Sequence, residues 1–369
     1  MNIKDERFNG TFKVLVILAL VLGLVSLTMN FLSMHFESEQ EKHPKPTSSA
    51  QSWTIEDEIH VINVFAAGTA DYGTRAALPG EYLTMFGNVD ELINNYNMAA
   101  YSQYSLLGMD LPASFGEIMT DMGFDMIGLA NPESLKYGKK GIDASMEYWL
   151  TTDAHISGTN TGTDYQNQMN PFSYNDISAV FLSFTDHLSA ELPESQHYLV
   201  NVYDDVKTPQ IIAKARSMAD IVVVSVFWDG EDSALPTDRQ KEMAQAMADA
   251  GASVIIGNAP NAIQPAAWID DTLIFYSMGS FISDDGDQMN RIGAVGAVTI
   301  TETISGDSRR IELTNPRVDF VASVPCDNGY MVKMLNDCAE NIEGKDDIYS
   351  RYSSVIQRMD DSIRIGGLQ

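Results

Sequence analysis

Short apolar runs alternate with helical patterns along most of this chain. Residues 59–66 read Ile-His-Val-Ile-Asn-Val-Phe-Ala, a β-branched run that stops before Gly68 as a buried strand does. Further strands are predicted at residues 125–129, 179–184, 221–226, 253–256 and 273–276. Helices are predicted at residues 89–95, 114–122, 211–218 and 238–250. This alternation, followed by β-rich sequence near 295–301 and 310–313, predicts a layered α/β domain.

A long apolar segment precedes this domain. No charged side chain lies between Lys13 and Glu37, which is enough apolar sequence to cross a bilayer as one helix. Basic residues precede the segment and acidic residues follow it, so the positive-inside rule predicts a cytoplasmic N-terminus and an extracellular main domain. A cleaved signal peptide is the alternative, but no small-x-small cleavage site follows the apolar core. We therefore predict a single-pass protein of the cell membrane.

The predicted organisation has five parts. A cytoplasmic tail (1–12), a transmembrane anchor (13–36), an extracellular linker (37–57), the α/β domain (58–322) and a C-terminal tail (323–369) follow one another. The tail carries apolar residues at three- and four-residue spacing over 348–365, which indicates an amphipathic helix. This helix packs on its own domain or docks on a membrane partner. Cys326 and Cys338 in the tail form one local disulfide or remain two free thiols.

The chain is strongly acidic. Its formal net charge is −28 and its pI is about 4.3. Nucleic acid is excluded as a partner because phosphate backbones are neutralised by clustered lysine and arginine, and no basic stripe occurs here. An anionic polymer would meet a repulsive field that bridging cations could screen. The plainer interpretation is a solvated acidic surface that keeps the domain soluble.

Four short motifs carry a resemblance to a known family. They are Gly-Phe-Asp-Met-Ile-Gly-Leu-Ala-Asn at 123–131, Tyr-Gly-Lys-Lys-Gly-Ile at 137–142, Ala-Asp-Ile-Val-Val-Val-Ser at 219–225, and Ile-Phe-Tyr-Ser-Met-Gly-Ser-Phe at 274–281. In this order they resemble the bacterial capsule-synthesis CapA-like (poly-γ-glutamate capsule) family, which is related to calcineurin-type metallophosphoesterases. The resemblance implies a four-layer αββα sandwich of two mixed sheets, with the site where strands end and loops begin.

The chain departs from the family pattern at the expected metal ligands. The Gly-Asp of the pattern is Gly68-Thr69 here, and its Ala-Asn-Asn-His is Ala-Asn-Pro-Glu at 130–133. Its His-Trp-Gly-x-Glu is Phe-Trp-Asp-Gly-Glu at 227–231, which keeps the tryptophan and the glutamate. Its Gly-His-His-Pro-His is Gly-Asn-Ala-Pro-Asn at 257–261, and its Gly-Asn-Phe is Gly-Ser-Phe at 279–281.

These departures predict a pocket that has lost its metal chemistry. A two-metal hydrolytic centre needs carboxylate and imidazole ligands, whereas amide, alanine and phenylalanine side chains cannot hold the ions. The resemblance places the vestigial pocket at Thr69, Asp71, Asn131, Glu133, Trp228, Glu231, Asn258, Asn261 and Ser280. We assign no metal ligand, no cofactor and no firm catalytic residue. A weakly bound calcium or magnesium ion is the alternative, held by carboxylates at Asp71, Glu133, Asp229, Glu231 and Asp232.

A scaffold that survives without its ligands indicates binding or assembly. The resemblance implies a non-catalytic subunit in capsule or poly-γ-glutamate biosynthesis or export, working with membrane-bound polymer-synthesis subunits. The alternative is a metal-dependent hydrolase or transpeptidase on cell-surface polymer. Glu133 or Glu231 would then act as general acid or base.

Overall fold

The computed structural model describes residues 18–29, 57–72, 89–229, 233–259, 261–327, 329–338 and 342–368. The chain divides into two units, Met1–Ile55 and Glu56–Gln369. In the first unit, residues 18–29 are helical. Among the described residues no helix is both long and apolar enough to span a bilayer. The rest of the predicted anchor, all of the cytoplasmic tail and all but the last residue of the linker lie outside the described residues.

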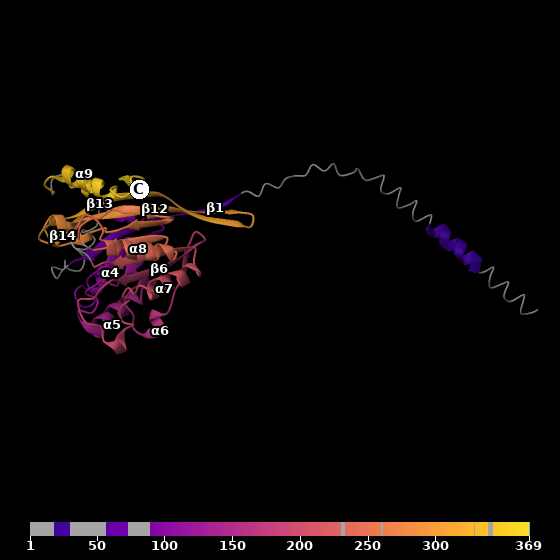
Figure 1. The fold of residues 1–369 in the computed structure, drawn as a ribbon, viewed down its shortest axis with the longest axis horizontal. Coiled ribbons are helices and arrows are strands. Elements are labelled where there is room, and N and C mark those ends of the chain that lie inside the picture. Colours follow the sequence, from indigo (N-terminus) through magenta and orange to yellow (C-terminus); the bar gives the residue numbers. More distant parts are fainter. Residues whose placement is uncertain are drawn as a thin grey trace, which may run out of the picture. The chain divides into compact units, whose positions relative to one another are not determined.

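The larger unit contains a nine-stranded mixed sheet (Figure 1). Its main strands, in spatial order, are β14 (Gly329–Met334), β13 (Ser308–Cys326), β12 (Ile292–Ser305), β1 (Glu58–Asp71), β2 (Met98–Gln103), β3 (Met126–Gly128) and β4 (His155–Ser157). Strands β1 to β4 are parallel, and β12 to β14 are antiparallel. In addition, β11 (Ser280–Ser283) pairs with β1, and β15 (Arg364–Ile365) pairs with β13.

A second mixed sheet has six strands. In spatial order they are β5 (Phe172–Tyr174), β6 (Ile177–Thr185), β7 (Ile221–Phe227), β8 (Val254–Asn258), β10 (Thr272–Phe275) and β9 (Ala266–Ile269). The four central strands are parallel, and the two edge strands are antiparallel to their neighbours. The central strands are apolar over nearly their whole length because both of their faces are covered. The predicted α/β class and the two mixed sheets are confirmed.

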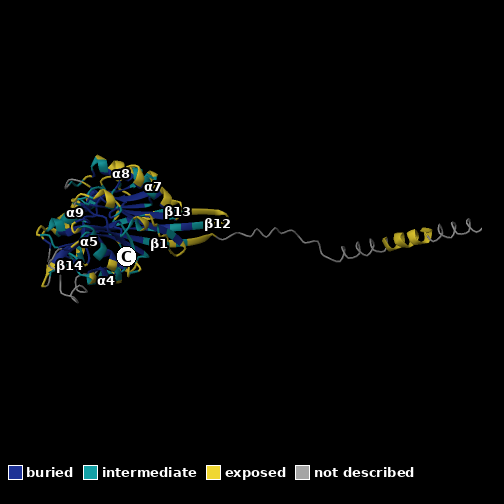
Figure 2. Ribbon diagram, turned by 90° about the horizontal axis from the view of Figure 1, so that it is seen from below, coloured by how far each residue is buried: buried dark blue, intermediate teal, exposed yellow. Residues whose placement is uncertain are grey.

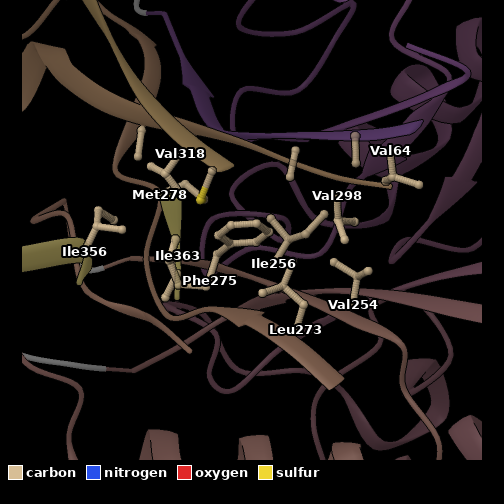
Figure 3. Close-up of a cluster of buried hydrophobic side chains, with 14 of the residues drawn as sticks. Val64, Val254, Ile256, Leu273, Phe275, Met278, Val298, Val318, Ile356 and Ile363 are labelled. Carbon is tan, nitrogen blue, oxygen red and sulfur yellow. The ribbon is translucent and has the colours of Figure 1, made fainter. Parts of the chain in front are cut away.

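The two sheets pack face to face around one hydrophobic cluster (Figure 3). Side chains alternate across a strand, so Val64 on β1 points into this cluster while Phe65 joins the cluster on the opposite face. Val254 and Ile256 on β8 enter the same central cluster from the other sheet. Figure 2 shows the buried residues concentrated in the sheets, with the far end of the β12–β13 hairpin exposed.

Helices cover both outer faces. On the nine-stranded sheet lie α3 (Asp90–Ile93), α4 (Ala113–Asp121) and α5 (Gly138–Trp149). On the six-stranded sheet lie α7 (Lys207–Arg216) and α8 (Asp238–Asp249). The described elements therefore form four layers, helix, sheet, sheet and helix. Short segments complete the domain: α6 (Thr163–Gln166), η1 (Glu194–Gln196), η2 (Met289–Arg291) and η3 (Leu335–Asp337).

Local sequence explains where α8 starts and stops. The Thr237 hydroxyl accepts a hydrogen bond from the Gln240 backbone N–H, and the Gln240 side chain accepts one from the Thr237 N–H. This reciprocal capping box satisfies two helix donors that would otherwise have no partner. Gly251, with φ of +100°, follows the helix and allows the left-handed turn into β8.

The C-terminal segment belongs to the same domain. Strand β13 continues past residue 322, where the sequence places the end of the domain, and β14 extends the sheet further. Helix α9 (Lys345–Ile356) contributes Tyr352 and Ile356 to the central cluster, where Tyr352 lies 5.8 Å from the Phe320 ring. The predicted amphipathic helix thus packs on its own domain, but it ends at Ile356, and the prediction of a helix as far as 365 was wrong because Arg364–Ile365 pairs with β13 as a strand. Cys326 is exposed, Cys338 is buried, and both are free thiols.

Candidate functional site

The residues of the predicted pocket lie where parallel strands of both sheets end. At the end of β1, Thr69 is in register with Ser102 on β2 and with Ser280 on β11. The backbone of β1 approaches Gly279 so closely that a Cβ on Gly68 would lie 2.2 Å from the Gly279 carbonyl oxygen. A glycine is therefore required at position 68, and the adjacent Thr69 N–H donates to that same carbonyl.

A chain of hydroxyl and amide groups joins the two sheets beneath this point. The Ser102 and Ser225 hydroxyls are 2.8 Å apart, and the Asn258 side chain donates to the Ser225 Oγ at 3.1 Å. These three residues are buried. Gly128 on β3 leaves the space for this network, because a Cβ there would lie 2.9 Å from the Ser225 Oγ. These buried polar groups between the strand ends are thus neutral and bonded to one another.

Asn258 occupies one of the positions where the family pattern has an imidazole. Its side chain is fully buried, and its Oδ1 has no hydrogen-bond partner among the described residues. Trp228 is tied to the same strand end, since its backbone N–H donates to the Asn258 carbonyl at 3.1 Å. The indole of Trp228 donates to the Tyr276 carbonyl at 2.6 Å, so this tryptophan fastens β7 to the segment after β10.

Asn131 holds the loops after β2 and β3 together. Its Nδ2 donates to the carbonyls of Gln103 and Tyr104 at 3.0 and 3.1 Å. Its Oδ1 accepts a hydrogen bond from the Glu133 backbone N–H at 2.8 Å. Both ends of the buried amide are therefore engaged within the protein, and Asn131 acts as a structural clamp.

Carboxylates gather on the outer rim of the pocket. The Asp71 side chain keeps contact with solvent, yet the protein mass around it removes bulk water, and together with Asp284 and Asp285 this raises its pKa to about 6. Burial, with the nearby charges of Glu133 and Asp71, raises the pKa of Tyr104 to about 12. The rim is acidic, and Asp71 holds its proton nearer to neutral pH than an ordinary aspartate does.

Lys136, a cation near Asp71, is already paired. The Lys136 ammonium lies 2.9 Å from the Asp110 carboxylate, which also accepts a hydrogen bond from the Tyr137 hydroxyl. The positive charge of Lys136 lowers the pKa of Asp71, but burial and the neighbouring aspartates raise that pKa by more. The balance of charge at the rim therefore stays negative.

The other predicted site residues differ in how far they are buried. Ser280 is buried within β11, whereas Asn261 is exposed on the loop after β8. Glu231 and Asp232 lie outside the described residues. Of the predicted set, Thr69, Asn131, Trp228, Asn258 and Ser280 are buried at the strand ends, while Asp71 is exposed and Glu133 is partly exposed.

Sequence reasoning missed several members of the site. Ser183 and Ser225 lie beside Gly128 together with Ser102, and single serines inside apolar strands, such as Ser225 within 221–226, were the available signal for the first two. His187 follows β6, and its Nδ1 lies 4.0 Å from the Asp229 carboxylate after β7. Only the packing of β6 beside β7 brings those two side chains together.

The donor set does not suit a two-metal centre. Asn131, Asn258 and Ser280 offer neutral amide and hydroxyl groups where transition ions need imidazole or carboxylate. Among the residues that the structure describes, no group of three or more histidine, cysteine, aspartate or glutamate side chains could hold a metal ion. Asp71, the carboxylate at the end of β1, has a raised affinity for a proton. We derive no chemical step through a metal at this site.

Comparison with known proteins assigns the class. Residues 75–285 match the family described as "Bacterial capsule synthesis protein PGA_cap". The match covers more than half of the chain, and the chain belongs to this family. It is 30% identical over 173 residues to the PGA biosynthesis protein CapA of Bacillus subtilis (strain 168), a segment of 46% of this chain and 45% of that protein. It is 32% identical over 174 residues to the capsule biosynthesis protein CapA of Bacillus anthracis, 45% and 42% of the two chains.

The chain thus matches less than half the length of these curated relatives. Among solved structures, a putative 5'-nucleotidase from Staphylococcus aureus is 13% identical, with a TM-score of 0.43 over 80% of this chain and 58% of that one. A hypothetical protein from Thermus thermophilus is 12% identical, with a TM-score of 0.41 over 69% and 98%. Both TM-scores are low, and neither structure adds to the family assignment.

Proposed function

We propose that this protein is anchored in the cell membrane by one helix, faces outward, and serves as a non-catalytic binding or assembly subunit in capsule or poly-γ-glutamate biosynthesis or export. Its membership of the PGA_cap family and its likeness to two proteins named CapA support the biosynthetic setting. The apolar segment 13–36, with basic residues before it and acidic residues after it, supports the anchor and its orientation.

The use of amide groups inside the pocket supports a role without catalysis. The Asn131 side chain donates hydrogen bonds to the Gln103 and Tyr104 carbonyls, and the Asn258 side chain donates one to the Ser225 hydroxyl. A metal-activated hydrolase needs ligands that lower the pKa of a bound water. Both amides are neutral, so neither can take a proton from a substrate or supply the charge that a carboxylate brings to a metal ion.

The partners follow from the same setting. Membrane-bound polymer-synthesis subunits are the expected partners, since a single helix would place this domain beside them. With a net charge of −28, the domain would meet an anionic polymer only through bridging divalent cations. No nucleic acid is expected.

One observation favours the alternative of a hydrolase or transpeptidase on surface polymer. The pKa of Asp71 is raised to about 6, and Glu133 lies at the same rim near Tyr104. A carboxyl group that keeps its proton near neutral pH can act as a general acid. In that case Glu133 or Glu231 would supply the second carboxylate beside a loosely held cation.

Metal content and turnover of the full chain separate the two functions. The protein would be purified in detergent, its metals measured by elemental analysis, and phosphoesterase and polyglutamate hydrolysis assayed with and without chelator. We expect less than stoichiometric transition metal and no turnover above a heat-denatured control. Stoichiometric metal with turnover that a chelator abolishes would refute the non-catalytic role.

A cellular experiment tests the same proposal from the opposite side. The variants Glu133→Gln and Glu231→Gln, alone and combined, remove the two carboxylates that the alternative requires. We expect unchanged polymer output and unchanged co-purification of multi-span membrane partners. A loss of polymer at normal protein level in the double variant would instead support the enzyme.

A further inference from the structure

A large cavity lies apart from the pocket at the strand ends. Its volume is about 1120 Å³, somewhat above the usual range of about 300 to 1,000 Å³ for small-molecule sites. It lies between the end of α5, strand β4, helix α6, the outer face of β6 and helix α7. Figure 1 shows α5, α6 and α7 grouped on the side of the domain away from α9. A cavity of this size accommodates an oligomer better than a single small metabolite.

One wall of the cavity is apolar. Val180, Leu182 and Phe184 project from the outer face of β6 and line it. Tyr165, next to them in the lining, is half-buried, and the His155 ring is stacked on Phe172 with centroids 3.5 Å apart. Burial lowers the pKa of His155, which favours its neutral form. This wall suits the C–H faces of a ligand.

Amide side chains dominate the polar part of the lining, among them Asn160, Gln166, Asn167, Gln168, Asn201 and Gln210. Some of these groups are fixed in place, since the Asn160 side chain donates to the Tyr198 carbonyl at 2.8 Å and to the Asn201 Oδ1 at 3.0 Å. Others are unoccupied: within the described part of the chain, no hydrogen bond engages the side chains of Asn167, Gln168 or Gln210. Amides both donate and accept, so they match hydroxyl groups.

Two lysines border the same cavity from α7. Lys207 and Lys214 are seven residues apart with Gln210 between them, so all three follow one face of the helix. In the described ranges neither lysine forms an ion pair with a carboxylate, unlike Lys136 and Lys139, although the backbone N–H and the charge of Lys207 both act on Asp204 and lower its pKa. Seven residues of helix separate their Cα atoms by about 10 Å, which is close to the length of a disaccharide unit.

The lining of the cavity holds few carboxylates although the chain as a whole is acidic, while the charges of Asp186 and Asp205 act on the lining residue Tyr203. Asp204 is the one carboxylate in its described lining, and it accepts hydrogen bonds from the Val206 and Lys207 backbone N–H groups. Two further lining residues, Trp149 and Tyr203, carry polar atoms that have no hydrogen-bond partner among the described residues. Both atoms are buried from solvent, so they do not contribute to the surface that a ligand would contact.

We propose that this cavity binds an acidic oligosaccharide, a chain of sugars in which some units carry a carboxylate. The apolar face of β6 takes the sugar C–H surface, the amides take the hydroxyls, and Lys207 and Lys214 take two carboxylates. The many amides beside only two lysines match a ligand whose hydroxyls outnumber its charges. A polyglutamate chain, with a carboxylate on every residue and no hydroxyls, fits this lining less well. The proposal does not depend on the role of the strand-end pocket.

Titration calorimetry with the full chain in detergent tests the assignment. The probes are a hexasaccharide of alternating glucuronate and N-acetylglucosamine, neutral maltohexaose, and a γ-linked glutamate hexamer. We expect the acidic sugar to bind and the other two to bind at least about tenfold more weakly, with added salt weakening the acidic sugar because exposed charges are screened. The Lys207→Gln/Lys214→Gln variant should lose about tenfold in affinity for the acidic sugar, while Lys140→Gln, an exposed lysine outside the cavity, should not.

Each other result overturns the proposal. Equal binding of maltohexaose with no effect of the lysine variants would mean a neutral glycan site. Preference for the glutamate hexamer would mean a polyanion site, and no binding of any probe would leave the cavity without this ligand class. Unchanged thermal melting of the variants guards against misfolding, and both lysines are exposed.

Discussion

The Asn258 side chain on β8 donates a hydrogen bond to the Ser225 Oγ on β7, at a distance of 3.1 Å. Ser225 in turn lies 2.8 Å from the Ser102 Oγ, which belongs to the other sheet. One amide at the position of an expected metal ligand thus helps to bind the two halves of the sandwich together. The buried polar groups at the strand ends therefore stabilise the contact between the two sheets.

A charge placed at position 258 should destabilise the fold. In Asn258→Asp the new carboxyl would be fully buried without a cation, so its pKa in the folded state would rise above the unfolded value. Stability would then be near normal below about pH 4 and would fall as pH rises, reaching a loss of at least about 2 kcal/mol at pH 7.5. Urea denaturation at pH 4 and pH 7.5 measures this difference.

The matched control is Asn261→Asp, because Asn261 is exposed on the following loop. This variant should stay within about 0.5 kcal/mol of the parent at both pH values. If Asn258→Asp were instead stabilised by added Mn²⁺ or Zn²⁺, the pocket would still be able to hold a metal once a charged ligand is restored.

Adding one methyl group at Gly128 should separate the sheets. A Cβ at this position would lie 2.9, 3.1 and 3.2 Å from the hydroxyls of Ser225, Ser102 and Ser183. Gly128→Ala should therefore cost about 1 to 3 kcal/mol of unfolding free energy through overpacking. Gly162→Ala is the control, since nothing lies within 4 Å of its Cβ position. Equal stability of the two variants would contradict the tight packing of the serine cluster.

The raised pKa of Asp71 predicts a pH dependence of stability. Its carboxyl has a pKa of about 6 in the folded state and about 3.8 as the reference value. The protonated Asp71 carboxyl therefore makes its full contribution to the stability of the parent protein below pH 3.8, and this contribution is lost as pH rises through 6. The Asp71→Asn variant should be more stable than the parent by about 1 kcal/mol at pH 7.5. This value is reduced because the Asp71 side chain reaches solvent, which screens its charge. Near pH 4 the two proteins should have the same stability.

Thermal or urea unfolding of both chains across this pH range provides the measurement. Asp361→Asn serves as the control, because Asp361 is exposed at the C-terminal end of the domain. A gain of stability in Asp71→Asn that is equal at pH 4 and pH 7.5 would show that the effect is not a titration.

The two cysteines should react very differently with a thiol reagent. Cys326 is exposed, whereas Cys338 is buried, donates to the Met334 carbonyl at 3.3 Å, and has a pKa raised by burial to about 11. Native protein should release one equivalent of chromophore from an aromatic disulfide reagent, and denatured protein two. Cys326→Ser should remove the fast phase. A count of zero in the native, unreduced protein would indicate a disulfide.

The sequence predicted features that depend on neighbouring residues better than features that depend on residues far apart in the chain. The strand at 221–226 and the helix at 238–250 were predictable because their signals are local: a continuous β-branched run, and a capping threonine with a glycine stop. Local patterns did not reveal that β13 passes beyond residue 322, because strand pairing with β14 sets that length. Glu231, a predicted site residue, lies outside the described residues and stays a prediction.

The sequence by itself determined the layered α/β class, the family and the loss of imidazoles at 257–261, since these depend only on residue type and order. Only the tertiary structure decided that Ser102 meets Ser225 from 123 residues away, and that Lys207 and Lys214 border a cavity. The physical reason is that periodicity fixes which side of an element faces inward. Which polar groups then meet across the layers depends on how complete sheets and helices pack.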